Sequence, residues 1–255
     1  MRHHYSKYIY QRSQDLSIFV ISDLHLSTNT DKSMEVFGSR WQNYCQRLEN
    51  NWNKVVSPED TVIVPGDISW ALSLEEAIPD LLFLESLNGT KIIGKGNHDF
   101  WWSTLTKIET VFKTQKIKTI KILHNNAYIV ENIVVCGTRG WYTDSHQQNA
   151  VNAPDYEKII NRELIRLKIS LDEAVKLKGD SDLKIIVFFH FPPVWNDFVS
   201  KEFLGLLSEY NISDCFFGHI HGNYGVNQKF SYNNVNFQLV SSDFLNFTPI
   251  PIIID

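Results

Sequence analysis

Five short polar clusters, most of them placed where an apolar run ends, constrain this chain more than any other feature. They are Asp23-Leu24-His25, Gly66-Asp67, Gly96-Asn97-His98-Asp99, His190 and Gly218-His219-Ile220-His221. Short apolar runs of this kind are typical of buried β-strands, and the carboxyl ends of parallel strands meet at one edge of a sheet. The pattern therefore predicts an α/β fold that gathers Asp, Asn and His side chains at one site.

The apolar pattern predicts alternating strands and helices. Strands are expected at 17–22, 61–65, 91–94, 183–189 and 214–217, and helices at 39–56, 73–87, 103–113, 155–178 and 201–210. Pro79 should kink or shorten the second helix. Three short runs at 119–123, 127–130 and 133–137, joined by Asn-rich turns, indicate a β-meander, and 235–254 is rich in strand formers. No repeat or linker interrupts the chain, so we expect a single domain over 1–255, with 140–155 as a mobile loop over the site.

Composition narrows the function classes. The chain has 255 residues, 43% hydrophobic and 21% charged, which suffices for a sizeable core. A net charge of −5 gives no basic footprint for long nucleic acids, so a nucleic-acid partner is not expected. The scattered cysteines Cys45, Cys136 and Cys215 indicate no disulfide framework and a reducing compartment. With no signal-like or membrane-spanning apolar stretch, the chain is expected to be cytoplasmic.

The polar clusters offer only oxygen and imidazole nitrogen as metal ligands. The candidate ligands are Asp23, His25, Asp67, Asn97, His190, His219 and His221. This set suits Mn, Fe or Zn, as well as Co and Mg, and does not single one out. Two such ions, roughly 3.5–4 Å apart, would hold a bridging hydroxide and clamp a phosphoryl oxygen. The clusters thus predict a two-metal hydrolase that cleaves a phosphoester bond.

Spacing suggests how the ligands are shared. Asp67 is the natural bridge, because a carboxylate can lend one oxygen to each ion and the preceding glycine carries no Cβ to crowd the turn. Asp23 and His25 are two residues apart, so in an extended segment their side chains would share one face and reach one ion. His219 and His221 have the same spacing.

Further residues are candidates for catalysis and substrate binding. His98 is kept out of the ligand set and is expected to assist the leaving-group oxygen, with Asp99 orienting its ring. Trp101 and Trp195 could form an aromatic wall for the substrate, although core packing is the alternative for both. Arg139 could grip a substrate phosphate or instead form a salt bridge.

The order D-x-H, G-D, G-N-H-D, H, G-H-x-H resembles the calcineurin-like metallophosphoesterase family over residues 17–222. The resemblance implies a four-layer α/β/β/α sandwich with two mixed sheets and the metal site at strand ends. It also implies one metal held by Asp23, His25, Asp67 and His221, and a second held by Asp67, Asn97, His190 and His219. His98 would match the family histidine that stabilises the transition state or protonates the leaving group.

Flanking residues narrow the resemblance within the family. The stretches PGDISWA, KGNHDFWW and HFPP are similar to a branch of predicted bacterial phosphohydrolases. The chain lacks the x-x-D-R-G continuation and the G-N-H-E motif of Ser/Thr protein phosphatases. SDLHLS resembles UDP-2,3-diacylglucosamine pyrophosphatases, which usually carry Arg where this chain has His98. A lipid pyrophosphatase would also need an exposed apolar surface beside the site, for which 140–155 offers only Trp141 and Tyr142.

The sequence thus favours a small phosphodiester or nucleotide-like substrate. The alternatives are a UDP-2,3-diacylglucosamine-type pyrophosphatase and a catalytically idle scaffold of the same fold. An idle scaffold would be expected to have lost ligands, and here the set is complete.

Overall fold

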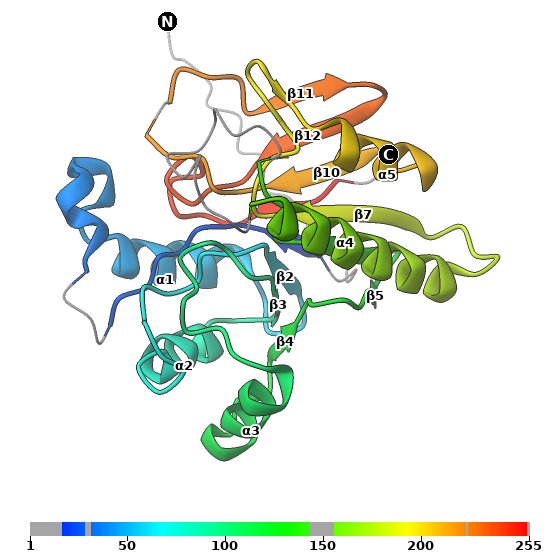
Figure 1. Cartoon of the computed structure of the whole chain (residues 1–255). Coiled ribbons are helices and arrows are strands. Elements are labelled where there is room, and N and C mark those ends of the chain that lie inside the picture. The colour runs from blue at the N-terminus through cyan, green and yellow to red at the C-terminus, as the bar shows by residue number, and fades with distance from the viewer. Residues whose placement is uncertain (1–16, 29–31, 143–155, 223, 254–255) are drawn as a thin grey trace, which may run out of the picture.

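The protein is built from two β-sheets that face each other, with helices on both outer faces (Figure 1). The computed structural model describes residues 17–28, 32–142, 156–222 and 224–253. The first sheet has the strand order β13-β1-β2-β3-β4, in which β1 to β4 are parallel and β13 is antiparallel to β1. Its strands are β1 (Ile18–Val20), β2 (Thr61–Val64), β3 (Thr90–Ile93), β4 (Ile120–Ile122) and β13 (Ile250–Pro251).

The second sheet has the order β11-β12-β10-β7-β6-β5. Its four central strands are parallel, and the edge strands β5 and β11 are antiparallel to their neighbours. The strands are β5 (Tyr128–Val130), β6 (Ile133–Thr138), β7 (Lys184–Phe189), β10 (Asp214–Phe217), β11 (Lys229–Tyr232) and β12 (Val235–Leu239). A separate small hairpin pairs β8 (Val194–Trp195) with β9 (Phe198–Val199).

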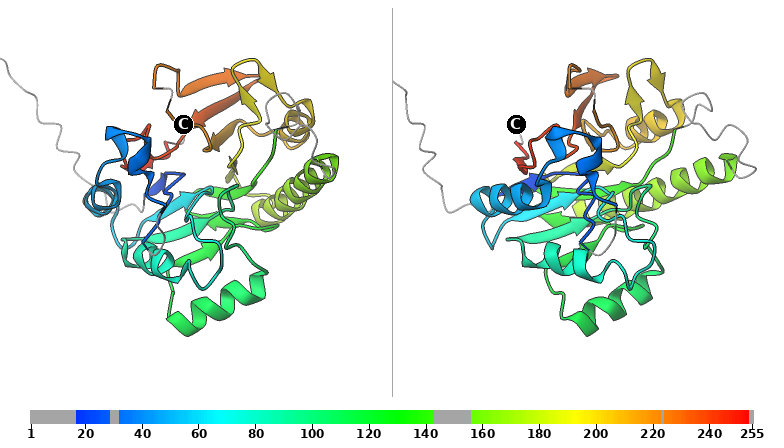
Figure 2. Two further views of the ribbon diagram at one scale, coloured as in Figure 1. Left: turned by 60° about the vertical axis from the view of Figure 1, so that its left-hand side comes forward. Right: turned by 90° about the vertical axis from the view of Figure 1, so that its left-hand side faces the viewer.

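Helices cover the outer faces of both sheets, as the two views of Figure 2 show. The helices are η1 (Met34–Phe37), η2 (Ser39–Trp41), α1 (Tyr44–Val55), α2 (Ile78–Ser86), α3 (Leu105–Gln115), α4 (Tyr156–Lys178) and α5 (Lys201–Glu209). In α1, for example, Tyr44, Leu48 and Trp52 recur every fourth residue and form the buried stripe of an amphipathic helix. No helix in the described part of the chain has the length and apolar character that crossing a membrane requires.

Three apolar cores separate the four layers. In β2, Val62 and Val64 pack with α1 to α3, whereas Ile63 faces the other sheet, as the alternation of a strand requires. Ile63 belongs to the core between the two sheets, which also contains Phe188 of β7. Val187 of the same strand belongs to the third core, which packs against α4 and α5. This arrangement confirms the predicted α/β/β/α sandwich.

Two local predictions had different outcomes. Pro79 shortens the second helix rather than kinking it, because α2 begins at Ile78 instead of residue 73 and the proline occupies its first turn, where a missing N–H costs nothing. The prediction of a meander was wrong. The three runs at 119–137 do not form a meander, since β4 pairs in parallel with β3 in the first sheet and β5 and β6 pair in the second. Each of these strands exists, but the chain crosses between the sheets after β4.

Candidate metal centre

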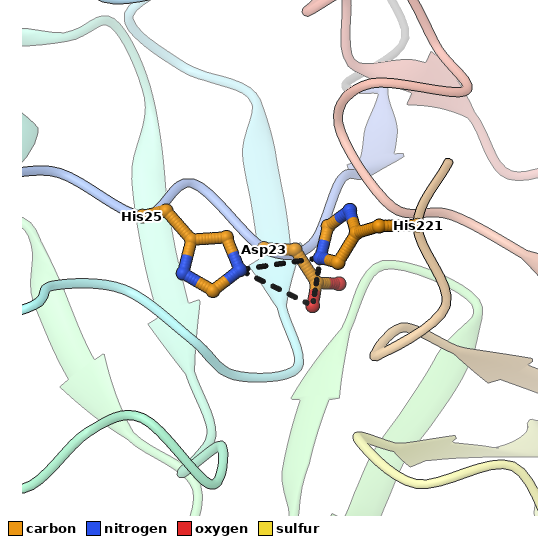
Figure 3. A group of neighbouring side chains, drawn as sticks. All are labelled: Asp23, His25 and His221. Atoms are coloured by element: carbon orange, nitrogen blue, oxygen red, sulfur yellow. Dashed lines mark hydrogen bonds and ion pairs between the residues drawn. The ribbon is translucent and has the colours of Figure 1, made fainter. Parts of the chain in front are cut away.

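A first group of side chains meets where β1 and β10 end. Figure 3 shows Asp23, His25 and His221 pointing toward one another. His221 Nε2 lies 3.2 Å from His25 Nε2 and 3.2 Å from Asp23 Oδ1. Asp23 and His25 are buried, with 0% and 2% of their surfaces exposed. Three potential ligand atoms thus surround a small volume that side chains shield from solvent.

A second group adjoins the first and comes from both sheets. Asn97, after β3, places its Oδ1 2.7 Å from His190 Nε2 and 2.9 Å from His219 Nδ1. Asp67, after β2, lies between the two groups: its Oδ2 is 3.5 Å from His190 Nε2 and 3.5 Å from His25 Nε2. The structure therefore brings together all seven ligand candidates that the sequence indicated.

The ligand segments are turns rather than extended strands. Asp23, His25, Asp67 and His219 all have positive φ, between 46° and 69°. The prediction that Asp23 and His25 share one face of an extended segment is therefore wrong, because β1 already ends at Val20. Left-handed conformations at non-glycine residues cost energy and persist where surrounding contacts fix them, as they often do at active sites.

Two glycines make room for ligand candidates. Gly66 has φ +136°, and a Cβ there would lie 2.6 Å from the backbone nitrogen of Gly96 and 2.9 Å from His190 Nδ1. A Cβ on Gly218 would collide with the carboxylate of Asp23. Any larger residue at either position would push a ligand candidate out of place, so the glycines of the motifs are packing requirements.

Burial keeps three of the imidazoles neutral. Burial first, and then neighbouring histidines, hold the pKa values of His25 and His190 well below the usual range. Burial likewise lowers the pKa of His219 to about 4. Neutral imidazoles present lone pairs, which is the form that binds metal ions. Burial, and then the charges of Asp23 and Asp99, raise the pKa of Asp67. A cation beside Asp67 would offset the repulsion between these carboxylates.

His221 is supported by an acid that the sequence analysis missed. Asp243 is fully buried, and its Oδ1 lies 2.9 Å from His221 Nδ1. Burial would lower the pKa of His221, but the charge of Asp23 and hydrogen bonds to Asp23 and Asp243 outweigh it and raise that pKa to about 10. Ser241 and Ser242 donate to Asp23 from the same segment. Asp243 follows a strand, as the ligand candidates do, but it belongs to none of the recognisable motifs.

The donor set fits divalent metal ions. His25 and His190 each direct Nε2 toward Asp67 Oδ2, at a distance of 3.5 Å. In a neutral imidazole one ring nitrogen carries a lone pair that can bind a metal ion. Carboxylate oxygens, an amide oxygen and neutral imidazoles, with no thiolate, form a ligand set for Mn, Fe, Zn or Mg.

His98 lies beside the ligand groups, and neither candidate ligand group found among the described residues includes it. Its ring centroid is 5.6 Å from that of His25 and 4.2 Å from that of Trp70. Its backbone nitrogen donates to Asp67 Oδ1 at 2.8 Å, which fixes the position of the turn. Burial is the largest influence on the His98 imidazole and lowers its pKa.

The carboxylate of Asp99 serves the turn rather than the His98 ring. It accepts hydrogen bonds from the backbone nitrogens of residues 67, 68, 69 and 96 and from Trp101 Nε1. The predicted contact that would orient His98 is absent among these interactions. Asp99 therefore holds the Asp67 turn against the Gly96 turn, and its side chain is fully buried.

The substrate-contact candidates have different surroundings. Trp101 is only 1% exposed and packs in the core, so it does not form a substrate wall. Trp195 is partly exposed and packs against the rings of Phe217 and Phe230 at the margin of the core around β10. Arg139 forms an ion pair with the buried Glu163 at 3.0 Å, and its carbonyl accepts the backbone N–H of His190. Of the 140–155 segment, only 140–142 belong to the described residues.

Comparison with known proteins agrees with this geometry. The family model described as calcineurin-like phosphoesterase matches residues 16–223. Among solved structures, phosphopantetheinyl hydrolase from Mycobacterium tuberculosis is similar, with 14% identity, a TM-score of 0.56 and coverage of 94% of this chain and 96% of that one. The protein TT1561 of Thermus thermophilus is similar at 11% identity and a TM-score of 0.58, with coverage of 93% and 99%.

At these identities the structural likeness establishes the fold alone. A search of curated proteins gives no significant match. The family match covers most of the chain and includes every candidate metal ligand from Asp23 to His221. The chain therefore belongs to the calcineurin-like phosphoesterases and is a metal-dependent hydrolase of phosphoester bonds.

Proposed function

We propose that this protein is a two-metal phosphohydrolase that cleaves a small phosphodiester or nucleotide-like substrate. The observation that carries the proposal is the position of Asp67. Its Oδ2 lies 3.5 Å from a ring nitrogen of His25 in one group and 3.5 Å from a ring nitrogen of His190 in the other. Asp23 is also near both groups, but its Oδ2 accepts from Ser241 and from the backbone of His219. Asp67 is thus the better bridge.

Each group would hold one ion. The first ion would be held by Asp23, His25, Asp67 and His221, and the second by Asp67, Asn97, His190 and His219. When bound, such ions neutralise phosphoryl oxygens and make water a better nucleophile at neutral pH. The chain itself contributes three buried imidazoles whose lowered pKa values keep them neutral, those of His25, His190 and His219, on turns held by hydrogen bonds.

His98 is proposed to assist departure of the alcohol. Water oxygen forms a bond to phosphorus while the bond from phosphorus to the leaving oxygen breaks, and the electron pair stays on that oxygen. His98 donates a proton to the leaving oxygen, and the proton lost by water passes to solvent. The tilted contact of the His98 ring with Trp70 holds the imidazole beside the ligand groups without using its ring nitrogens.

Charge supports a small substrate over a long nucleic acid. The net charge is −5, so the whole molecule does not attract a polyanion. Arg139 is 13% exposed at its side chain, and its Nε has no partner in the described part of the chain. The backbone carbonyl of Arg139 accepts a hydrogen bond from the backbone N–H of His190, so Arg139 adjoins a ligand candidate. Arg139 is therefore the proposed contact for a second anionic group of the substrate.

Substitution of the bridging acid tests the proposal. Asp67→Asn should abolish turnover of bis(p-nitrophenyl) phosphate and lower the metal content of protein measured by elemental analysis. Asp214→Asn is the matched control, because Asp214 begins β10 and pairs with Lys184, at the opposite edge of the sheet. If Asp67→Asn keeps both activity and metal while folding normally, the two-metal proposal is wrong.

A further inference from the structure

Exposed apolar side chains gather beside the metal centre. Val36 and Phe37 are 81% and 68% exposed, and together with Trp70 they line a groove of about 250 Å³. Lys32 and Ser33 complete its lining. Exposed apolar surface next to a polar centre is typical of ligand-binding grooves. In the sequence only Trp141 and Tyr142 were candidates for such a surface, whereas the structure has it at Val36, Phe37 and Trp70.

The turn that carries these side chains is anchored on both sides. Met34 of η1 is buried in the core, and Ser33 caps the turn by accepting from the backbone of Glu35. The carboxylate of Glu35 accepts from the backbone nitrogen of Asn43, just before α1. These contacts therefore fix the turn in the conformation that exposes the side chains of Val36 and Phe37.

Trp70 connects the groove to the catalytic side of the metal centre. Its ring stacks on His25, with centroids 5.0 Å apart and an angle of 24° between the planes. The same ring lies 4.2 Å from His98, and Phe100, 58% exposed, lies 6.2 Å from His98. A group attached to the oxygen that His98 protonates would meet this apolar surface first.

The polar groups of the groove are few. The Ser33 hydroxyl already accepts from Glu35, and Lys32 Nζ lies at the rim, 6.0 Å from the Trp70 ring centroid. Trp70 Nε1 is buried and has no hydrogen-bond partner among the described residues, so the lining offers a single buried N–H donor. A nucleobase would bring several donors and acceptors that this lining leaves unpaired, and unpaired polar groups weaken binding. A hydrocarbon chain brings none, so the lining favours an alkyl group.

We propose that this groove binds an alkyl group of the phosphoester substrate, attached through the oxygen that leaves. This inference rests on the proposed function and narrows its substrate class from small phosphodiesters in general to those with an apolar alcohol. It assigns Val36, Phe37 and Trp70 as residues that determine specificity.

A chain-length series of inhibitors tests the assignment. Linear alkylphosphonates from methyl to hexyl are measured as competitive inhibitors of bis(p-nitrophenyl) phosphate hydrolysis, and calorimetry of hexylphosphonate gives a readout without turnover. A fully buried methylene is worth about fourfold in affinity, and because this groove is open we expect roughly tenfold or more in total from methyl to hexyl. Adenosine 5′-monophosphate is measured in the same assay to test whether the groove prefers a nucleobase, and it should bind more weakly than hexylphosphonate.

Variants locate the effect in the groove. Val36→Ser and Phe37→Ser should each reduce the ratio of methyl to hexyl inhibition constants by about threefold or more, because both remove exposed apolar surface. Val175→Ser is the control and should leave the ratio unchanged. Val175 is 46% exposed on α4 and lies near Asn132 and Lys184, at the opposite edge of the sheet.

The outcomes separate this inference from the proposed function. Metal-dependent hydrolysis with inhibition constants that do not change with chain length would overturn the groove assignment and leave the two-metal proposal intact. Tighter binding of the nucleotide, or a dimer that Phe37→Ser dissociates while the ratio stays constant, would also overturn it. Absence of any metal-dependent hydrolysis would contradict the proposed function, and calorimetry would then still report whether the alkyl chain binds.

Discussion

At the scale of single residues, the side chains of the site are common metal ligands, whereas several of their backbone conformations are rare for residues other than glycine. Four ligand candidates adopt left-handed φ, and two glycines leave space that a Cβ would occupy. Hydrogen bonds from the backbone to Asp99, and from Ser241 to Asp23, hold these turns. The chemistry of the site therefore depends on residues that never touch the substrate as much as on those that do.

Removal of the His98 imidazole should separate catalysis from metal binding. His98→Ala is expected to lower kcat by about 10²–10⁴, the usual range for a general acid, because the imidazole proposed to protonate the leaving oxygen is removed. Steady-state kinetics and elemental analysis measure the two properties on the same preparation. Loss of a metal ion from this variant would reassign His98 as a ligand.

Asp243 should act on metal affinity through His221. Asp243→Asn removes the charge 2.9 Å from His221 Nδ1 and is expected to weaken metal binding by about 10–100-fold, as outer-shell acids commonly do. Competition with a chelator measures the affinity. A variant with unchanged affinity would show that Asp243 supports only the backbone of residue 222 and Tyr224, the other groups that donate to it.

At the scale of secondary structure elements, a buried lysine joins β3 to the end of α2. Lys91 is fully buried, and its Nζ donates to the carbonyls of Leu87 and Gly89 at 2.7 and 2.9 Å. These carbonyls follow the last turn of α2, where a cation is favourable. Lys91→Met should lower the free energy of unfolding at pH 7 by roughly 1–3 kcal/mol, because the two carbonyls lose their donor.

The same lysine predicts a pH dependence. Burial lowers the pKa of Lys91 to about 8, and the charge of Glu85 offsets only part of this effect. Between that value and 10.5, the ordinary value, the unfolded chain binds more protons than the folded one, so the wild type should gain stability relative to Lys91→Met as pH rises. Denaturant titrations of both proteins at pH 7 to 10 measure this difference. A flat or falling difference would contradict the lowered pKa.

The elements were more predictable than their arrangement. Apolar runs at 61–65 and 183–189 and the helical period at 155–178 correspond to β2, β7 and α4, because burial of one face or both leaves a direct pattern in the sequence. The pattern does not state which sheet a strand joins, so β4 and β5 were wrongly placed in one meander. The ligand candidates were recognisable because they occur in motifs, whereas Asp243 stands outside any motif.

At the scale of the whole molecule, the metal centre joins the two sheets. Asp23, Asp67 and Asn97 follow strands of the first sheet, and His190 and His219 follow strands of the second. Metal ions that bind these residues bind the folded state alone. At a free metal concentration 100 times Kd, binding should add about 2.7 kcal/mol, which raises Tm by roughly 5–10 °C for a chain of this size.

Calorimetry with and without a chelator measures this shift. The matched variant is Asp67→Asn, in which the proposed bridge is lost and the shift should be much smaller. An equal shift in the variant and the wild type would mean that the ions bind elsewhere on the molecule. A shift absent from both would contradict metal coupling between the sheets.

The span of the site along the chain has a consequence for biosynthesis. Asp23 accepts hydrogen bonds from Ser241 and from the backbone of His219, so its carboxylate is complete only when residues about 200 positions later are in place. Asp23 and His25 are synthesised before His219, His221 and Asp243. An ion that needs side chains from both segments can therefore bind only after the later segment has been made and has folded against the first sheet.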